Sequence, residues 1–80
     1  MVTYIFTKQT GKPQTSGGRT VTYQIYKMSK NKPHHLGEHK ANTAAYRGDI
    51  VEVKSFIAKK EGYKFDGHRF ARGDIEIEEI

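Results

Sequence analysis

The chain has 80 residues, no cysteine and a net charge of +5 at neutral pH. This length fits one domain over residues 1–80, and the absence of cysteine excludes disulfides and thiolate metal sites. The sequence contains neither an apolar run long enough to span a bilayer nor the apolar core of a signal peptide. We therefore expect a cytoplasmic protein without a membrane partner (in the host cytoplasm, if it is viral).

The charge is distributed unevenly along the chain. Residues 1–47 carry eight lysines and arginines against a single acid, Glu38, and residues 48–73 hold six bases and four acids. The last seven residues, 74–80, contain four acids and no base. A basic body of this kind favours polyanionic partners, although a lysine-rich surface also serves simple solubility.

The first half of the chain alternates apolar and polar residues as strands do. Val2–Thr7 and Arg19–Met28 are rich in β-branched and aromatic residues, which predicts two strands. His34–Ala41 predicts a third strand, and its lack of large apolar residues indicates an edge. Gly11–Gly18 has the composition of a loop, and the segment SKNKP is expected to turn the chain before the third strand.

A helix is predicted at Asp49–Glu61, because apolar residues recur there at the spacing of one helix face. Asp49 and Glu52 have the spacing of an acidic capping box at its start. Gly62 stands where a left-handed glycine commonly ends a helix. Thr43 is an alternative cap, which would begin the helix earlier.

The letters RGDI occur twice, at Arg47–Ile50 and Arg72–Ile75, but the residues that follow them differ. The first copy leads into the helical pattern, whereas the second leads into DIEIEEI, an alternating acidic segment typical of a strand. We interpret both copies as a turn followed by the start of an element. They do not indicate a duplicated unit.

The pair Asp66-Gly67, flanked by aromatic residues, is the strongest hairpin signal in the chain, because a type I′ turn needs positive φ at both central positions. The elements then follow the order β-β-β-α-β-β. We predict an α+β fold in which one helix packs on a small antiparallel sheet of four to five strands. The core candidates are Val21, Tyr23, Ile25, Val53, Phe56, Ile57, Phe65 and Phe70.

The sequence offers little for catalysis or for a cofactor. Three histidines crowd into residues 34–39, and His35 and His39 are predicted to share one face of a strand. A zinc site needs three or four converging ligands, so solvated or phosphate-facing histidines are the simpler interpretation. The glycine-rich segment lacks the Lys-Ser/Thr of a phosphate loop, and the acids are assigned to caps, a turn and the last strand. We expect no enzymatic activity, no cofactor and no metal.

Basic residues are interleaved with aromatic ones along one stretch of the chain. This mixture suits single-stranded nucleic acid, because cations contact phosphates while planar rings stack on exposed bases. We therefore expect a small, basic, non-enzymatic nucleic-acid-binding protein that prefers RNA or other single strands to duplex DNA. The residues assigned to this surface are Lys12, Arg19, Tyr26, Lys27, Lys30, Lys32, His34, His35, Lys40 and Arg47. The alternative is that the tyrosines fill the core and a second face and that the lysines are merely solvated.

The small size, the composition of YQIYKMSKNK (residues 23–32) and the lack of an active site together suggest a resemblance. In these respects the chain is similar in style to small bacteriophage-encoded proteins that bind host or defence components. The resemblance implies an alternative function as a protein-binding, antitoxin-like inhibitor of a host toxin or defence factor, in some cases acting together with RNA. It rests on no diagnostic motif and assigns no functional residue.

The acidic terminal strand is a candidate interface between copies of the chain. Ile75 and Ile77 alternate with acids in a short terminal segment, which is typical of an edge strand. We expect this strand to pair with a second copy and form a homo-oligomer, most simply a homodimer. The alternative is that it pairs with the basic Arg19–Met28 strand of the same chain, where cross-strand pairs would offset the charge.

Overall fold

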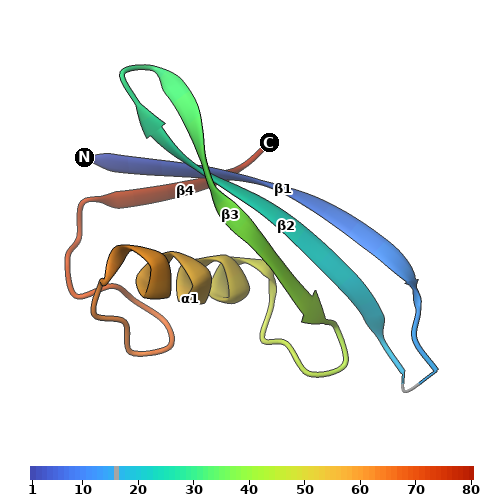
Figure 1. The fold of residues 1–80 in the computed structure, drawn as a ribbon. Coiled ribbons are helices and arrows are strands. Elements are labelled where there is room, and N and C mark those ends of the chain that lie inside the picture. Colours follow the sequence, from blue (N-terminus) through green and yellow to red (C-terminus); the bar gives the residue numbers. More distant parts are fainter. Residues whose placement is uncertain (16) are drawn as a thin grey trace.

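A computed structural model of the chain describes residues 1–15 and 17–80, and these residues form four strands and one helix (Figure 1). The predicted α+β class is confirmed, and the helix begins and ends at the predicted residues. Ser16, inside the predicted Gly11–Gly18 loop, lies outside the described residues. The elements in chain order are β1 (Val2–Pro13), β2 (Arg19–Ser29), β3 (Lys32–Asn42), α1 (Asp49–Glu61) and β4 (Ile75–Glu79).

The strands lie side by side in the order β3-β2-β1-β4. The contacts of β1 with β2 and of β2 with β3 are antiparallel, whereas β4 runs parallel to β1. The sheet is therefore mixed rather than wholly antiparallel. Because β3 and β4 run in the same direction, α1 is the crossover connection that parallel strands require. The predicted alternative, in which the last strand pairs with Arg19–Met28, is wrong, since β4 lies beside Val2–Phe6.

The helix packs across one face of the sheet (Figure 1), and within the described residues the opposite face is left open. Of the predicted core residues, five are buried, while Phe56 and Phe70 are half-buried against them and Phe65 is half-buried outside the cluster. Tyr4 and Phe6 of β1 are also fully buried and were not among the predicted core residues. The buried cluster consists of Tyr4, Phe6, Val21, Tyr23, Ile25, Val53 and Ile57.

The two ends of α1 differ from each other in how closely they follow the prediction. Gly62 has φ 73°, and its N–H donates to the carbonyl of Ala58, so the left-handed glycine cap is confirmed. The capping box is wrong, because the N-cap residue is Gly48 and it makes no side-chain cap hydrogen bond. Asp49 and Glu52 instead point their carboxylates at the sheet, where cationic and hydroxyl partners are available.

The predicted turn at SKNKP (residues 29–33) is confirmed, and it is this turn that has the type I′ conformation. Lys30 and Asn31 have φ 53° and 63° between the paired residues Ser29 and Lys32, which makes the β2–β3 connection a two-residue type I′ turn. Asp66 does not share this left-handed conformation, so the predicted type I′ turn at Asp66-Gly67 is wrong. Around this turn, the additional strand predicted between the helix and the last strand is reduced to one bridge, between Phe65 and Phe70.

A β-bulge in β3 places His35 and His39 on opposite faces of the sheet. Tyr26 pairs with His35 and Ile25 pairs with Gly37, so Leu36 is an extra residue on this strand. Because one inserted residue moves every later side chain to the other face, His35 lies on the open face while His39 faces α1. The prediction that these two histidines share a face is therefore wrong.

The remaining boundaries need only small corrections. The first strand continues to Pro13, with an irregularity after Thr10, so Gly11–Pro13 belongs to a strand rather than to the predicted loop. The turn that follows is closed by the N–H of Gln14, which donates to the carbonyl of Gly18. No helix among the described residues has the length and apolar character needed to cross a membrane.

Candidate nucleic-acid interface

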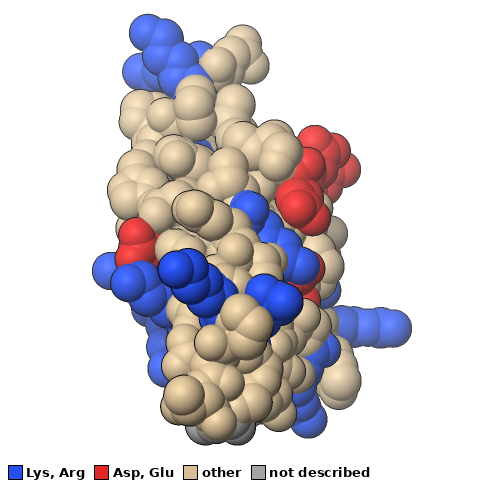
Figure 2. Space-filling view, turned by 90° about the vertical axis from the view of Figure 1, so that its right-hand side faces the viewer, with Lys and Arg blue, Asp and Glu red and all other residues tan. Residues whose placement is uncertain are grey.

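The last rungs of the β2–β3 hairpin bring together six of the ten predicted binding residues. We call residues 26–35 the hairpin end; it contains five lysines and histidines and no acid. Its rungs pair Tyr26 with His35, Lys27 with His34 and Ser29 with Lys32, and Lys30 lies in the turn. Figure 2 shows lysine and arginine side chains gathered at the upper end of the molecule, where Figure 1 places this turn.

On the open face, the hairpin end carries a pair of aromatic rings. The centroids of Tyr26 and His35 lie 5.3 Å apart with the rings tilted by 56°. The Nε2–H group of His35 donates to Gln24 Oε1 over 2.7 Å, and Gln24 Nε2 donates to Glu38 Oε2 over 2.7 Å. Because a carboxylate only accepts hydrogen bonds, these two hydrogen bonds fix the orientation of the Gln24 amide and the tautomer of His35. The ring pair is thus held in place on a sheet surface that no described element covers.

A shallow hollow of about 360 Å³ lies beside the turn on the same side of the sheet. Its lining combines apolar and polar side chains with the ammonium group of Lys30. Such a hollow offers apolar contact next to a cation, which suits a base attached to a phosphate. The lining residues are Met1, Thr3, Met28, Lys30 and Asn31.

Lys27 differs from the other lysines of the hairpin end because it points towards α1. Its Nζ lies 2.9 Å from Glu61 Oε1, at the last residue of the helix. The hydrogen bond with Glu61 raises the pKa of Lys27, and the same bond lowers the pKa of Glu61. The charge of Lys27 is therefore largely balanced within the protein, and a phosphate would have to compete with Glu61 for it.

The other predicted residues do not join the hairpin end. Lys12 and Arg19 lie at the opposite end of β1 and β2, where Arg19 Nη1 donates to the carbonyl of Gly11. Lys40 lies on β3 with its Nζ 3.7 Å from Glu38 Oε1. Arg47 belongs to the connection that precedes α1. The predicted stretch is therefore continuous in sequence but divided in space.

The predicted oligomer residues, Ile75 and Ile77, lie on the core side of β4. Both are half-buried and pack against the buried cluster, and Ile77 is the register partner of Tyr4. Their side chains serve the core of the same chain. What β4 presents outward is the hydrogen-bonding edge of the sheet together with Glu76 and Glu78.

A second basic surface, which was not predicted, covers α1 and the loop that follows it. All four acids of residues 48–73 are engaged: Asp49 and Glu61 bond to the sheet, Glu52 bonds to His39, and Asp66 accepts backbone N–H groups. The bases of the same segment have none of these acids as a partner. Lys59, Lys60, Lys64 and Arg69 are exposed, Arg72 pairs with Asp74, and Lys54 is half-buried and donates to the carbonyl of His68.

The histidine cluster is not arranged as a metal centre. Within residues 1–15 and 17–80, no group of three or more His, Asp or Glu side chains is placed to hold an ion. The bulge separates His35 from His39, and His39 Nε2 lies 2.8 Å from Glu52 Oε1 while its ring stacks on Tyr23 at 6.0 Å. His39 thus belongs to the contact between sheet and helix.

Comparison with known proteins does not assign the chain to a family. No protein-family model, no curated protein and no solved structure matches this sequence or fold at a significant level. The interpretation of the hairpin end therefore rests on the charges, rings and contacts of the chain itself.

Proposed function

We propose that this chain is a small, non-enzymatic nucleic-acid-binding protein that contacts single strands, RNA in preference to duplex DNA, through its hairpin end. The observation that carries the proposal is the concentration of Lys30, Lys32, His34 and His35 on a projecting hairpin that contains no acid. A cationic projection of this kind contacts phosphates from several sides at once and raises the rate of encounter with a polyanion.

The preference for single strands follows from the aromatic pair. Tyr26 and His35 lie on an uncovered sheet surface, and such rings stack only on bases that are not already stacked in a duplex. Lys30 in the turn and Lys32 next to it supply the cations for the neighbouring phosphates of the strand. The hollow beside the turn offers room for a neighbouring base.

The test is to measure the binding of a labelled single-stranded RNA and of a matched DNA duplex from low to physiological salt. Three phosphate contacts predict a log–log slope of about −2 for the single strand, at about −0.7 per phosphate. We expect the double variant Lys30→Glu/Lys32→Glu to lose binding. The matched control is Lys59→Glu/Lys60→Glu, which makes the same charge change on α1 and should weaken binding far less. The proposal fails if the hairpin variant binds as tightly as the wild type, or if the RNA does not bind even at low salt.

A second candidate function, as a protein-binding inhibitor, is favoured by the edge position of β4. An edge strand offers unpaired backbone groups, and β4 adds Glu76, Glu78 and Glu79 to them. A basic extended segment, from a host toxin, a defence factor or a second copy of this chain, fits such an edge by β-augmentation. Sedimentation of the protein alone tests the homo-oligomer. Self-association at this edge is contradicted if the protein sediments as a monomer at every concentration and if Glu76→Lys/Glu78→Lys does not change its sedimentation.

A further inference from the structure

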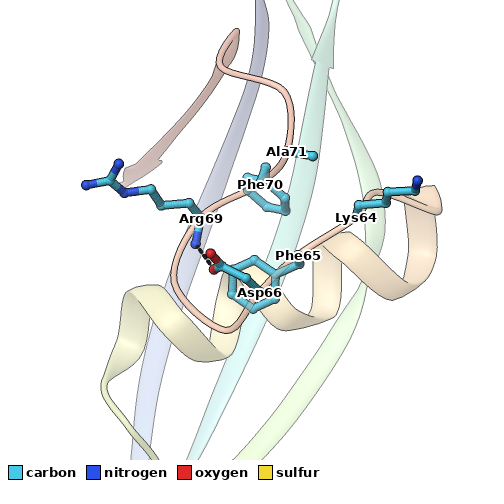
Figure 3. Close-up of a pocket in the computed structure, with 6 residues that line it drawn as sticks. All are labelled: Lys64, Phe65, Asp66, Arg69, Phe70 and Ala71. Atoms are coloured by element: carbon cyan, nitrogen blue, oxygen red, sulfur yellow. Dashed lines mark hydrogen bonds between the residues drawn. The ribbon is translucent and has the colours of Figure 1, made fainter.

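The loop between α1 and β4 borders a shallow, open hollow that the proposed function does not use. Its volume is about 300 Å³, at the lower limit of small-molecule sites. Figure 3 shows the rings of Phe65 and Phe70 inside this loop; their centroids lie 5.4 Å apart and the rings are tilted by 42°. The hollow is lined by Lys64, Phe65, Asp66, Arg69, Phe70 and Ala71.

The loop is held in shape by its own hydrogen bonds. Asp66 Oδ1 accepts the N–H groups of both His68 and Arg69 over 2.8 Å, and the N–H of Asp66 donates to the carbonyl of Arg69 over 3.2 Å. At its base the N–H of Ala71 donates to the carbonyl of Lys64 over 2.9 Å. The hollow is therefore formed before any ligand arrives, which lowers the entropic cost of binding.

The two aromatic rings of the hollow have different structural roles. Phe70 packs against the buried cluster and meets Tyr63 edge-on with centroids 5.6 Å apart, so its ring contributes to folding. Phe65 is half-buried and lies outside that cluster. A large aromatic side chain that lines an open hollow without joining the buried cluster offers a ring face to a planar ligand.

The charge around the hollow is positive. In Figure 3 the side chains of Lys64 and Arg69 extend on opposite sides of the two rings. Lys54 Nζ donates to the carbonyl of His68 over 3.0 Å, which brings a third cation to the loop. The single acid, Asp66, is occupied by the backbone N–H groups of Arg69 and His68. The surroundings therefore favour an anion.

We infer that this hollow binds an aromatic base together with its phosphate, with the base against Phe65 and the phosphate at Arg69 or Lys64. Two sources supply that chemistry, a free mononucleotide and an unstacked nucleotide of a bound single strand. Only the strand-borne form rests on the proposed function. The hollow lies in the loop after α1, away from the hairpin end, so the two sites are separable by mutation.

The first experiment titrates the ¹⁵N-labelled full chain with AMP and follows the backbone amides by NMR. We expect saturable shifts concentrated at residues 64–71. Phe65→Leu keeps an apolar side chain but removes the ring. It should weaken the affinity for AMP on the order of tenfold, as for loss of one stacked base. Arg69→Glu should abolish the shifts, whereas Lys59→Glu, the same charge change on the exposed surface of α1, should leave them within about twofold of the wild type.

The second experiment measures a single-stranded oligonucleotide with the same variants and separates the two sources. If Phe65→Leu and Arg69→Glu weaken the binding of the oligonucleotide as well, the hollow binds a base of the strand. If they weaken only the binding of AMP, the hollow binds a free nucleotide. The inference is overturned if AMP leaves the amides of residues 64–71 unshifted and if both variants bind the oligonucleotide as tightly as the wild type does. The Lys30→Glu/Lys32→Glu variant decides the proposed function independently. If Phe65→Leu fails to fold, Arg69→Glu and Lys64→Glu carry the test alone.

Discussion

The hydroxyl group of Tyr23 donates a 2.5 Å hydrogen bond to Asp49 Oδ1 and so joins the centre of the sheet to the first residue of α1. Lys8, the cross-strand partner of Tyr23, approaches the other oxygen of the same carboxylate at 2.7 Å. The same arrangement recurs at the far end of the helix, where Tyr4 donates to Glu61 over 2.8 Å. Burial raises the pKa of both tyrosines, so each remains a protonated donor at neutral pH. The helix is thus fixed to the sheet at both ends.

Removing the Tyr23 hydroxyl should destabilise the fold measurably. We expect Tyr23→Phe to lower the free energy of unfolding by about 1–2 kcal/mol, because a buried hydrogen bond to a charged acceptor is lost. Urea denaturation at pH 7 measures the change. Tyr26→Phe is the matched control, since no hydrogen bond of the Tyr26 hydroxyl is found among the described residues, and it should cost less than about 0.5 kcal/mol. Equal effects of the two substitutions would contradict the role given to the Tyr23–Asp49 contact.

The same carboxylates should make stability fall at acid pH. Burial raises the pKa of Asp49, but the hydrogen bonds from Lys8 and Tyr23 outweigh burial, and the net pKa is lowered. The hydrogen bond from Lys27 likewise lowers the pKa of Glu61. A carboxyl whose pKa is lower in the folded than in the unfolded state stabilises the fold above the unfolded pKa of about 4. This contribution is lost as the pH falls through the folded pKa.

Urea denaturation between pH 7 and pH 2 tests this sign. The wild type should lose stability from roughly pH 5 downward. Asp49→Asn and Glu61→Gln should start from a lower stability at pH 7 and lose less over the same range. Glu78→Gln, on an exposed residue of β4, should follow the wild-type curve. Curves of the Asp49 and Glu61 variants that run parallel to the wild type would refute the assignment.

A close approach of backbone and ring explains the glycine in β3. A Cβ atom at Gly37 would lie 2.6 Å from Cζ of Phe56, so the Phe56 ring or the helix that carries it would have to shift. We expect Gly37→Ala to lower the free energy of unfolding by about 1–3 kcal/mol through overpacking. Gly73→Ala, where nothing lies within 4 Å of the added atom, is the control. In a double-mutant cycle, Phe56→Leu should relieve much of the cost, and strictly additive effects would disprove the steric origin.

Local signals explain what the sequence predicts well. The helix follows from its apolar period and from Gly62, both of which act within a few residues, and the hairpin end is continuous in sequence, so its bases and rings were identified together. The faces of β3 depend instead on the extra residue Leu36, which becomes visible only when β3 is aligned with β2. The direction of β4 depends on the path of the loop after Gly62, which carries no periodic signal.

The free charges of the candidate site could not be predicted by counting acids and bases along the sequence. By composition, residues 1–47 are the basic part and residues 48–73 are nearly balanced. In the fold, Asp49 and Glu61 turn inward to Lys8 and Lys27, so the sheet loses free cations and the helix surface keeps its own. This exchange depends on tertiary contacts between residues far apart in sequence. The hollow at Phe65 was missed for a related reason, because its ring was assigned to the core.

The pairing of Lys27 with Glu61 leads to a prediction about binding that goes beyond the change in net charge. If the hairpin end binds RNA, Glu61→Gln should release the ammonium of Lys27 to a phosphate. We expect tighter binding at low salt, and a log–log salt slope steeper by about 0.7 for one added contact. Glu78→Gln, which removes the same charge from an exposed residue of β4, is the control for net charge alone. Lys27→Met should change wild-type binding little but should cancel the gain in the Glu61→Gln background. If Lys27→Met instead weakens the wild type as strongly as Lys30→Met, then Lys27 already contacts the strand and the competition with Glu61 is refuted.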